Sequence, residues 1–143
     1  MRNFVKSKLK EEKGLTLIEL LAVIVILGII AAIAIPAIGN IITNSKVNSL
    51  MADGQNALSA ANIYFADTNS NEATLAQLKD GYLDDEGGFK GATDFKVVKK
   101  DGGNELTGTA KNGDISVKFS GATNAQITAA DNKDGGTNVE VTR

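Results

Sequence analysis

Apolar and polar positions divide the chain into three regions with different periodicities. From Leu20 to Ile38 no side chain is polar, so every face of a helix built from this segment is equally apolar. From Thr43 to Asp67 apolar residues recur at helical spacing along one stripe. After that, short β-prone runs alternate with turns. The pattern predicts one helix from Leu15 to Asp67, about 80 Å long, followed by a small sheet.

The second half of this helix is amphipathic and needs a cover from the same chain. We therefore expect an α+β fold in which three or four antiparallel strands pack on the amphipathic half, while the apolar half protrudes. The expected stripe consists of Val47, Leu50, Met51, Gly54, Leu58, Ala61 and Phe65.

The expected elements after the long helix are short. Glu72–Lys79 is predicted to be a helix with Leu75 and Leu78 facing inward. The Asn-Gly pair within Lys111–Asp114 suits a type I′ hairpin. The other expected elements are strands within Asp94–Lys100, Glu105–Ala110, Ile115–Ser120 and Thr137–Thr142, and a doubtful strand or coil at Asn124–Ala130.

The composition excludes several kinds of enzyme. Histidine and cysteine are absent, which removes Ser-His-Asp and Cys-His catalysis, disulfides and zinc sites built from the usual ligands. A signal-anchored hydrolase using Asp and Glu pairs is the enzymatic alternative, and it should still work with residues 1–42 replaced by a soluble tag. Only scattered carboxylates support it, so we expect no catalytic residue, metal or cofactor.

The amino-terminal region predicts a membrane-inserted helix. As a helix, Leu20–Ile38 covers about 28 Å, close to the thickness of a bilayer core. The segment before it is basic, with Arg2, Lys6, Lys8, Lys10 and Lys13. Positive charge stays on the cytoplasmic side, so we expect a single span with its N-terminus inside and its C-terminus outside. An ordinary secretory signal peptide is the alternative, but its apolar region would be shorter.

Residues 13–19 read Lys-Gly-Leu-Thr-Leu-Ile-Glu and precede the apolar run directly. This arrangement resembles the class III signal of type IV prepilins and pseudopilins. The resemblance implies cleavage by a prepilin peptidase between Gly14 and Leu15, followed by N-methylation of Leu15. Leucine takes the place of the phenylalanine that most members have there. The expected parts are a leader (1–14), a transmembrane and filament-core helix (15–42) and an extracytoplasmic head (43–143).

Glu19 matches the glutamate that the family places five residues into the mature chain. A carboxylate near hydrocarbon is costly, so it indicates a function. In a helix bundle, Glu19 of one subunit can neutralise the Leu15 amine of its neighbour and favour assembly. The alternatives are contacts with water at the headgroup level or a cap at the helix start.

Pro36 matches a proline that loosens the long helix in this family. It lacks a backbone N–H, and its ring crowds the preceding turn. We therefore expect a kink or a locally unwound stretch over residues 33–40, in the subunit or only in the filament. A mild bend at the membrane exit is the alternative.

The favoured function is that of a pilin which polymerises into a helical surface filament (fimbrium) for adhesion, twitching motility or DNA uptake. The alternative is a pseudopilin of a type II secretion or competence system. The expected partners are other copies of the chain, the prepilin peptidase, an assembly platform with its ATPases, and the membrane before assembly.

Two charged clusters are weakly supported candidates for binding sites. Asp84-Asp85-Glu86 is a candidate calcium site, but it lacks the spaced ligands of a known loop, so a solvated surface loop is favoured. Lysines without interleaved aromatic residues on an acidic head do not favour direct nucleic-acid binding, and lysines at a sheet edge more often guard against unwanted pairing. These lysines are Lys96, Lys99, Lys100 and Lys118.

Overall fold

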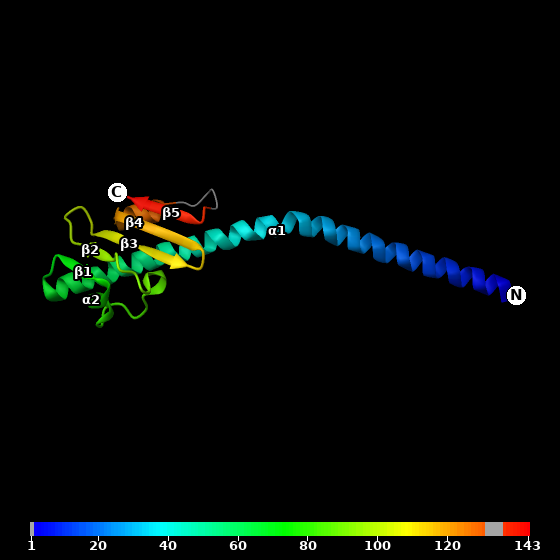
Figure 1. Ribbon diagram of the computed structural model, residues 1–143, viewed down its shortest axis with the longest axis horizontal. Coiled ribbons are helices and arrows are strands. Elements are labelled where there is room, and N and C mark those ends of the chain that lie inside the picture. The colour runs from blue at the N-terminus through cyan, green and yellow to red at the C-terminus, as the bar shows by residue number, and fades with distance from the viewer. Residues whose placement is uncertain (1, 131–135) are drawn as a thin grey trace. The chain divides into compact units, whose positions relative to one another are not determined.

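A computed structural model describes residues 2–130 and 136–143, with side chains described from residue 16 onward. The first element, α1 (Arg2–Thr68), is a single helix that contains Pro36. The chain divides into two compact units, one ending at Gly39 and the other beginning at Asn40. The later elements are β1 (Glu72–Thr74), α2 (Leu75–Lys79), the 3-10 turn η1 (Gly87–Phe89), β2 (Lys96–Val98), β3 (Glu105–Asn112), β4 (Ile115–Ala122), α3 (Asn124–Ala129) and β5 (Asn138–Thr142) (Figure 1).

The strands form one sheet in the order β1-β2-β3-β4-β5. The predicted α+β class is confirmed, but the sheet has five strands rather than three or four, and β5 runs parallel to β4. A parallel neighbour needs a crossover connection, and the segment that contains α3 supplies it. The prediction of a strand or coil at Asn124–Ala130 is therefore wrong. Thr123 begins α3 with a capping box that it forms with Gln126.

The short helix after α1 is shorter than predicted. Its first three residues, Glu72–Thr74, instead form β1 and pair with β2. Leu78 is buried as expected, and Leu75 is only partly buried. The helix ends in a turn, where the backbone N–H groups of Tyr82 and Leu83 both donate to the carbonyl of Leu78. The side chains of Tyr82 and Leu83 pack against the core.

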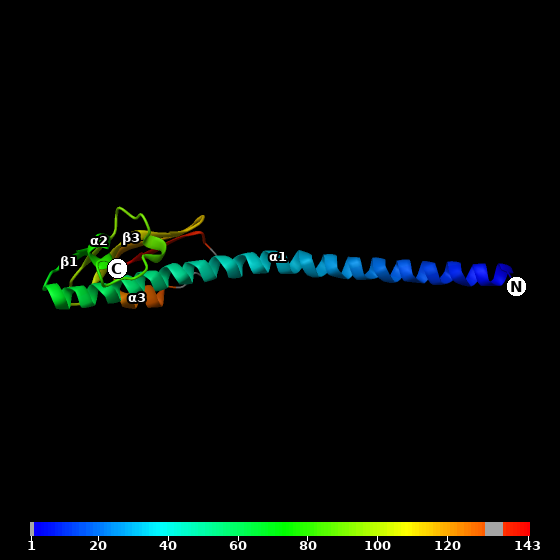
Figure 2. The ribbon, with the colours of Figure 1, turned by 90° about the horizontal axis from the view of Figure 1, so that it is seen from below.

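The core lies between the sheet and the amphipathic half of α1, as predicted from the stripe. The six apolar stripe residues are buried, and the sheet contributes Val97, Leu106, Val117 and Phe119 to the same core. Gly54 allows a close approach of the two layers, since a Cβ there would lie 2.8 Å from Cζ of Phe119. Helix α3 lies beside α1, where Nε2 of Gln55 donates to Oγ1 of Thr128 at 3.0 Å (Figure 2).

The β3–β4 hairpin is present, but its turn differs from the predicted one. Asn112 pairs with Ile115, so the two central residues are Gly113 and Asp114. Gly113 has φ 62°, whereas Asp114 is not among the residues with positive φ. Positive φ at the first central position alone is typical of a type II′ turn rather than type I′.

Residues 33–40 are helical in this single subunit. A locally unwound stretch around Pro36 is therefore absent from the isolated chain. Unwinding or kinking of these residues in an assembly stays a prediction.

Candidate functional site

The first half of α1 exposes a long apolar surface. Between Leu17 and Ile42 the large apolar side chains are 51% to 71% exposed, and Glu19 is the only charged residue of this stretch. The segment is long and apolar enough to cross a membrane, and none of its most apolar window is buried. Soluble monomers rarely expose a continuous apolar patch of this length. The arrangement therefore requires lipid or another apolar partner.

The predicted site residues occupy this same helix. Gly14 and Leu15 are consecutive residues inside α1. Leu15 and Glu19 are four residues apart in α1, so their backbone positions are about one turn from each other along the axis. Glu19 and Pro36 are both exposed. Pro36 lies about 25 Å further along the axis, so it does not join Leu15 and Glu19 in one cluster.

The second half of α1 holds a later loop through the carboxylate of Asp53, which lies outside the predicted apolar stripe. Oδ2 of Asp53 accepts a hydrogen bond of 2.8 Å from the backbone N–H of Gly88. A Cβ on Gly87 would lie 2.4 Å from Cγ of Asp53, so glycine is needed there. The one sequence signal was the Gly87-Gly88 pair, which permits this close approach.

The acidic cluster at residues 84–86 is engaged in local structure. Oδ1 of Asp85 accepts from the N–H of Gly87 at 2.9 Å, and Glu86 forms an ion pair with Lys79. Within the part of the chain that the structure describes, no three Asp or Glu residues are grouped as metal ligands would be. The geometry therefore does not support the hypothesis of a calcium site at residues 84–86.

The end of α1 is held by a tyrosine. The hydroxyl of Tyr82 donates to Oδ2 of Asp67 at 3.1 Å, and its ring packs edge-on against Tyr64 with centroids 5.3 Å apart. Partial desolvation raises the pKa of Tyr82 above its ordinary value. The hydrogen bond to Asp67 and the charge of that carboxylate raise this pKa further, because a phenolate would face another anion.

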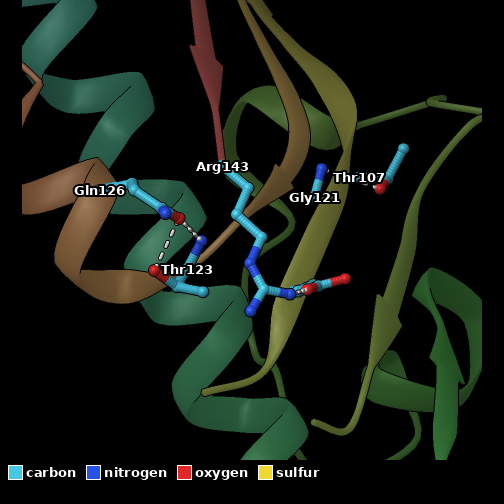
Figure 3. A network of polar contacts seen from close by, with 6 residues as sticks. Thr107, Gly121, Thr123, Gln126 and Arg143 are labelled. Atoms are coloured by element: carbon cyan, nitrogen blue, oxygen red, sulfur yellow. Dashed lines mark hydrogen bonds and ion pairs between the residues drawn. The ribbon is translucent and has the colours of Figure 1, made fainter. Parts of the chain in front are cut away.

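A polar network fastens the C-terminal end of the sheet (Figure 3). The guanidinium of Arg143 bonds to the carboxylate of Glu105, which joins the chain end after β5 to the start of β3. Gly121 lies at a bulge with φ 64°, and its N–H donates to Oγ1 of Thr107 at 3.2 Å. These contacts stabilise the sheet and contain no nucleophile paired with a base.

Lys96 and Lys118 lie on interior strands rather than at a sheet edge. Nζ of Lys96 lies 2.7 Å from Oε1 of Glu72, and Nζ of Lys118 lies 3.7 Å from Oε1 of Glu140. Each pair joins neighbouring strands on the solvent side of the sheet. The prediction that these lysines guard a sheet edge is therefore wrong for both. They contribute to cross-strand pairing instead.

Comparison with known proteins finds one sequence motif and several relatives that are similar in sequence. The family profile described as "Prokaryotic N-terminal methylation motif" matches residues 9–35. The "Type IV major pilin protein PilE" of Neisseria gonorrhoeae is 35% identical over 123 residues, which cover 76% of this chain and 72% of that protein. The "Type IV major alpha-pilin" of Moraxella bovis is 36% identical over 107 residues, which cover 71% of this chain and 64% of that protein.

Another relative matches a shorter stretch with higher identity. The "Type IV major fimbrial protein FimA" of Dichelobacter nodosus is 52% identical over 42 residues, which cover 29% of this chain and 27% of that protein. No solved structure gives a significant match. The matched motif lies within α1 and overlaps the exposed apolar part of this helix.

Proposed function

The chain belongs to the type IV pilin family, and from this premise we propose that it is the precursor of a pilus subunit that is cleaved, N-methylated and polymerised. Its role is structural rather than enzymatic, in keeping with relatives named as major pilins and fimbrial proteins. Adhesion, twitching motility and DNA uptake are the filament-level tasks that fit such a subunit.

The observation that carries the proposal is the uncovered apolar half of α1. Its large side chains are more than half exposed, whereas the apolar stripe of the head is buried by the sheet. Before assembly, lipid covers this surface. After assembly, the same surface packs against the helices of other copies, so that a head-to-tail contact which does not close forms a filament.

Processing prepares the subunit for its transfer from the membrane to the filament. The prepilin peptidase cuts between Gly14 and Leu15 and so removes the basic leader, while the apolar helix is kept. Methylation of the new amine then marks Leu15 as the first residue of the mature subunit. The motif profile over residues 9–35, which spans both positions, supports this assignment.

Glu19 and Pro36 serve assembly. An ionised Glu19 among apolar helices is costly unless a cation neutralises it. The amine of Leu15 from a neighbouring subunit is such a cation, and the pair fixes the axial stagger between subunits. Pro36 removes one helical hydrogen bond and lets residues 33–40 adapt to packing in the filament.

The remaining proposed partners act when the subunit is inserted in the membrane and when it is assembled. The precursor spans the cytoplasmic membrane once, with its basic leader inside and its head outside. An assembly platform with its ATPases extracts the mature subunit into a surface filament. The pseudopilin alternative predicts short filaments that remain trapped in the envelope rather than long filaments on the surface.

Two measurements test the proposal on native material. Mass spectrometry of the chain from a sheared surface fraction should show loss of residues 1–14 and one added methyl group at Leu15. Electron microscopy of the same fraction should show long filaments. A native chain that still begins at Met1 and stays dispersed without detergent would refute the proposal.

Substitution of Glu19 tests the assembly residue. Removal of one partner of a buried charge pair costs about 3–5 kcal/mol. Glu19→Ala and the isosteric Glu19→Gln should therefore be processed normally but yield few filaments, counted by electron microscopy, while Glu19→Asp keeps the charge and should retain more. Efficient filament formation by Glu19→Gln would remove this role from Glu19.

A further inference from the structure

The peptide bond assigned to cleavage lies inside a helix. Helix α1 begins at Arg2 and continues to Thr68, so Gly14 and Leu15 lie about three turns from its start. In this geometry the N–H of Leu15 donates to the carbonyl of Glu11, and the carbonyl of Gly14 accepts from the N–H of Ile18. Both sides of the bond are thus engaged in the helix.

A helical peptide bond is a poor substrate for hydrolysis. Water must add to the carbonyl carbon of Gly14, and the C–N bond to Leu15 then breaks to leave a Gly14 carboxylate and a Leu15 amine. A peptidase needs access to this backbone. Proteolysis of a structured segment acts on its transiently opened state, and its rate follows the population of that state when opening is fast.

Gly14 is placed where opening is easiest. It is the only glycine or proline between Arg2 and Leu27. A glycine inside a helix is destabilising relative to alanine because it loses the most backbone entropy. The residues that follow are strongly apolar, which favours the helix in a membrane, where all backbone groups must be bonded internally.

We propose that processing requires local unwinding of α1 around residues 11–15 and that helix stability in this segment sets the cleavage rate. The inference rests on the proposed function, since it assumes cleavage at this bond. Gly14 acts here as a positioning residue that weakens the helix, in addition to any closer approach that its missing side chain allows.

Substitution of Gly14 itself would change both helix stability and side-chain size. Neighbouring positions separate the two effects. Glu11→Gly and Glu11→Ala remove the same charge and leave the residues from 13 to 19 intact, but glycine weakens the helix and alanine strengthens it. Lys10→Gly and Lys10→Ala form a second matched pair at the preceding position in the sequence.

The test measures kcat/KM for cleavage of the full-length precursor in detergent micelles by purified prepilin peptidase, followed by mass spectrometry. At each position the glycine variant should be cleaved about fivefold faster than the alanine variant, which is the helix-propensity difference of about 1 kcal/mol converted at 1.4 kcal/mol per factor of ten. Hydrogen exchange of the Leu15 amide in the uncleaved precursor should rise by a similar factor.

The outcomes separate this inference from its premise. If the wild-type precursor is cleaved but the glycine variants are no faster than the alanine variants, local unwinding does not limit the reaction and the inference is overturned while the proposed function stands. Opposite effects at positions 10 and 11 would point to direct enzyme contacts and overturn it as well. If the wild-type precursor is not cleaved after Gly14, the proposed function fails, and the inference fails with it.

Discussion

The two halves of α1 have the same helical backbone and both carry many apolar residues, yet the apolar side chains of the two halves have opposite surroundings. Ile24 in the first half is 64% exposed, whereas Leu50 in the second half is 1% exposed. The second half is covered by a sheet from its own chain. The first half has no such cover within the described residues of the subunit. A single subunit is therefore enough to form the whole helix. It buries the apolar side chains of the second half only.

The largest expected effect comes from truncating one apolar residue in each half. Phe119 is fully buried and packs on Phe89 with ring centroids 5.7 Å apart. Phe119→Ala should lower the free energy of unfolding of the head by about 3–5 kcal/mol. Ile24→Ala should change it by less than about 0.5 kcal/mol. Urea unfolding in a mild detergent measures both, and similar losses would contradict the contrast.

A smaller effect is expected from adding one methyl group to a glycine in each half. Gly54→Ala places a Cβ against the ring of Phe119 and should cost about 1–2 kcal/mol of head stability, since overpacking exceeds the gain in helix propensity. Gly28 has nothing within 4 Å of its would-be Cβ, so Gly28→Ala is the matched control and should not destabilise the head. The same denaturation assay applies, and an unchanged midpoint for Gly54→Ala would show that the two layers are less tightly packed.

The smallest effect concerns Tyr82, which packs on the covered half only. Its pKa is raised in the folded head, so the folded state holds the phenolic proton more tightly than the unfolded chain, whose pKa is near 10.0. The contribution of this group is complete below that pH and is lost as the pH rises toward the folded pKa. Thermal unfolding from pH 8 to pH 11 should show a decline that Tyr82→Phe reduces. An equal decline in Tyr82→Phe would exclude this tyrosine as its source.

The sequence predicted most of what depends on periodicity. The stripe from Val47 to Phe65 identified the covered face of α1, and the alternation at Ile115, Val117 and Phe119 identified the inner face of β4. Both signals are local, since a residue's place in a regular element decides its face. Ala57 and Ala60 are also buried but were not predicted, because small residues give a weak hydrophobic signal.

Features that depend on distant partners were missed. The direction of β5 is decided by the crossover through α3, and the strand pattern itself is the same for either direction. Glu72–Thr74 is too short and polar to read as a strand without its partner β2. Asp53 bonds to a backbone group 35 residues away, which no local pattern reveals. The helical state of the residues before Leu15 was not predicted either, although it bears on how the proposed cleavage site presents its backbone.

The candidate site has a more local sequence signal than the sheet, because that signal is concentrated in consecutive residues; the roles of its residues stay predictions. The motif at residues 13–19 and the apolar run after it are both readable without any tertiary information. What the sequence could not supply is the neighbouring copy that would pair with Glu19. The proposed pairing needs a second copy of the chain, so a test of it requires an assembly.

The central claim is that other copies of the chain cover the apolar half of α1 in the filament. The protein has no cysteine, so a single introduced thiol reports on one position. Val25→Cys in the apolar half and Asp101→Cys on the exposed β2–β3 loop can be compared by labelling with a water-soluble maleimide in intact, detergent-free filaments and after denaturation. The account predicts that Asp101→Cys is labelled in both states and Val25→Cys only after denaturation. Equally fast labelling of both thiols in intact filaments would contradict it.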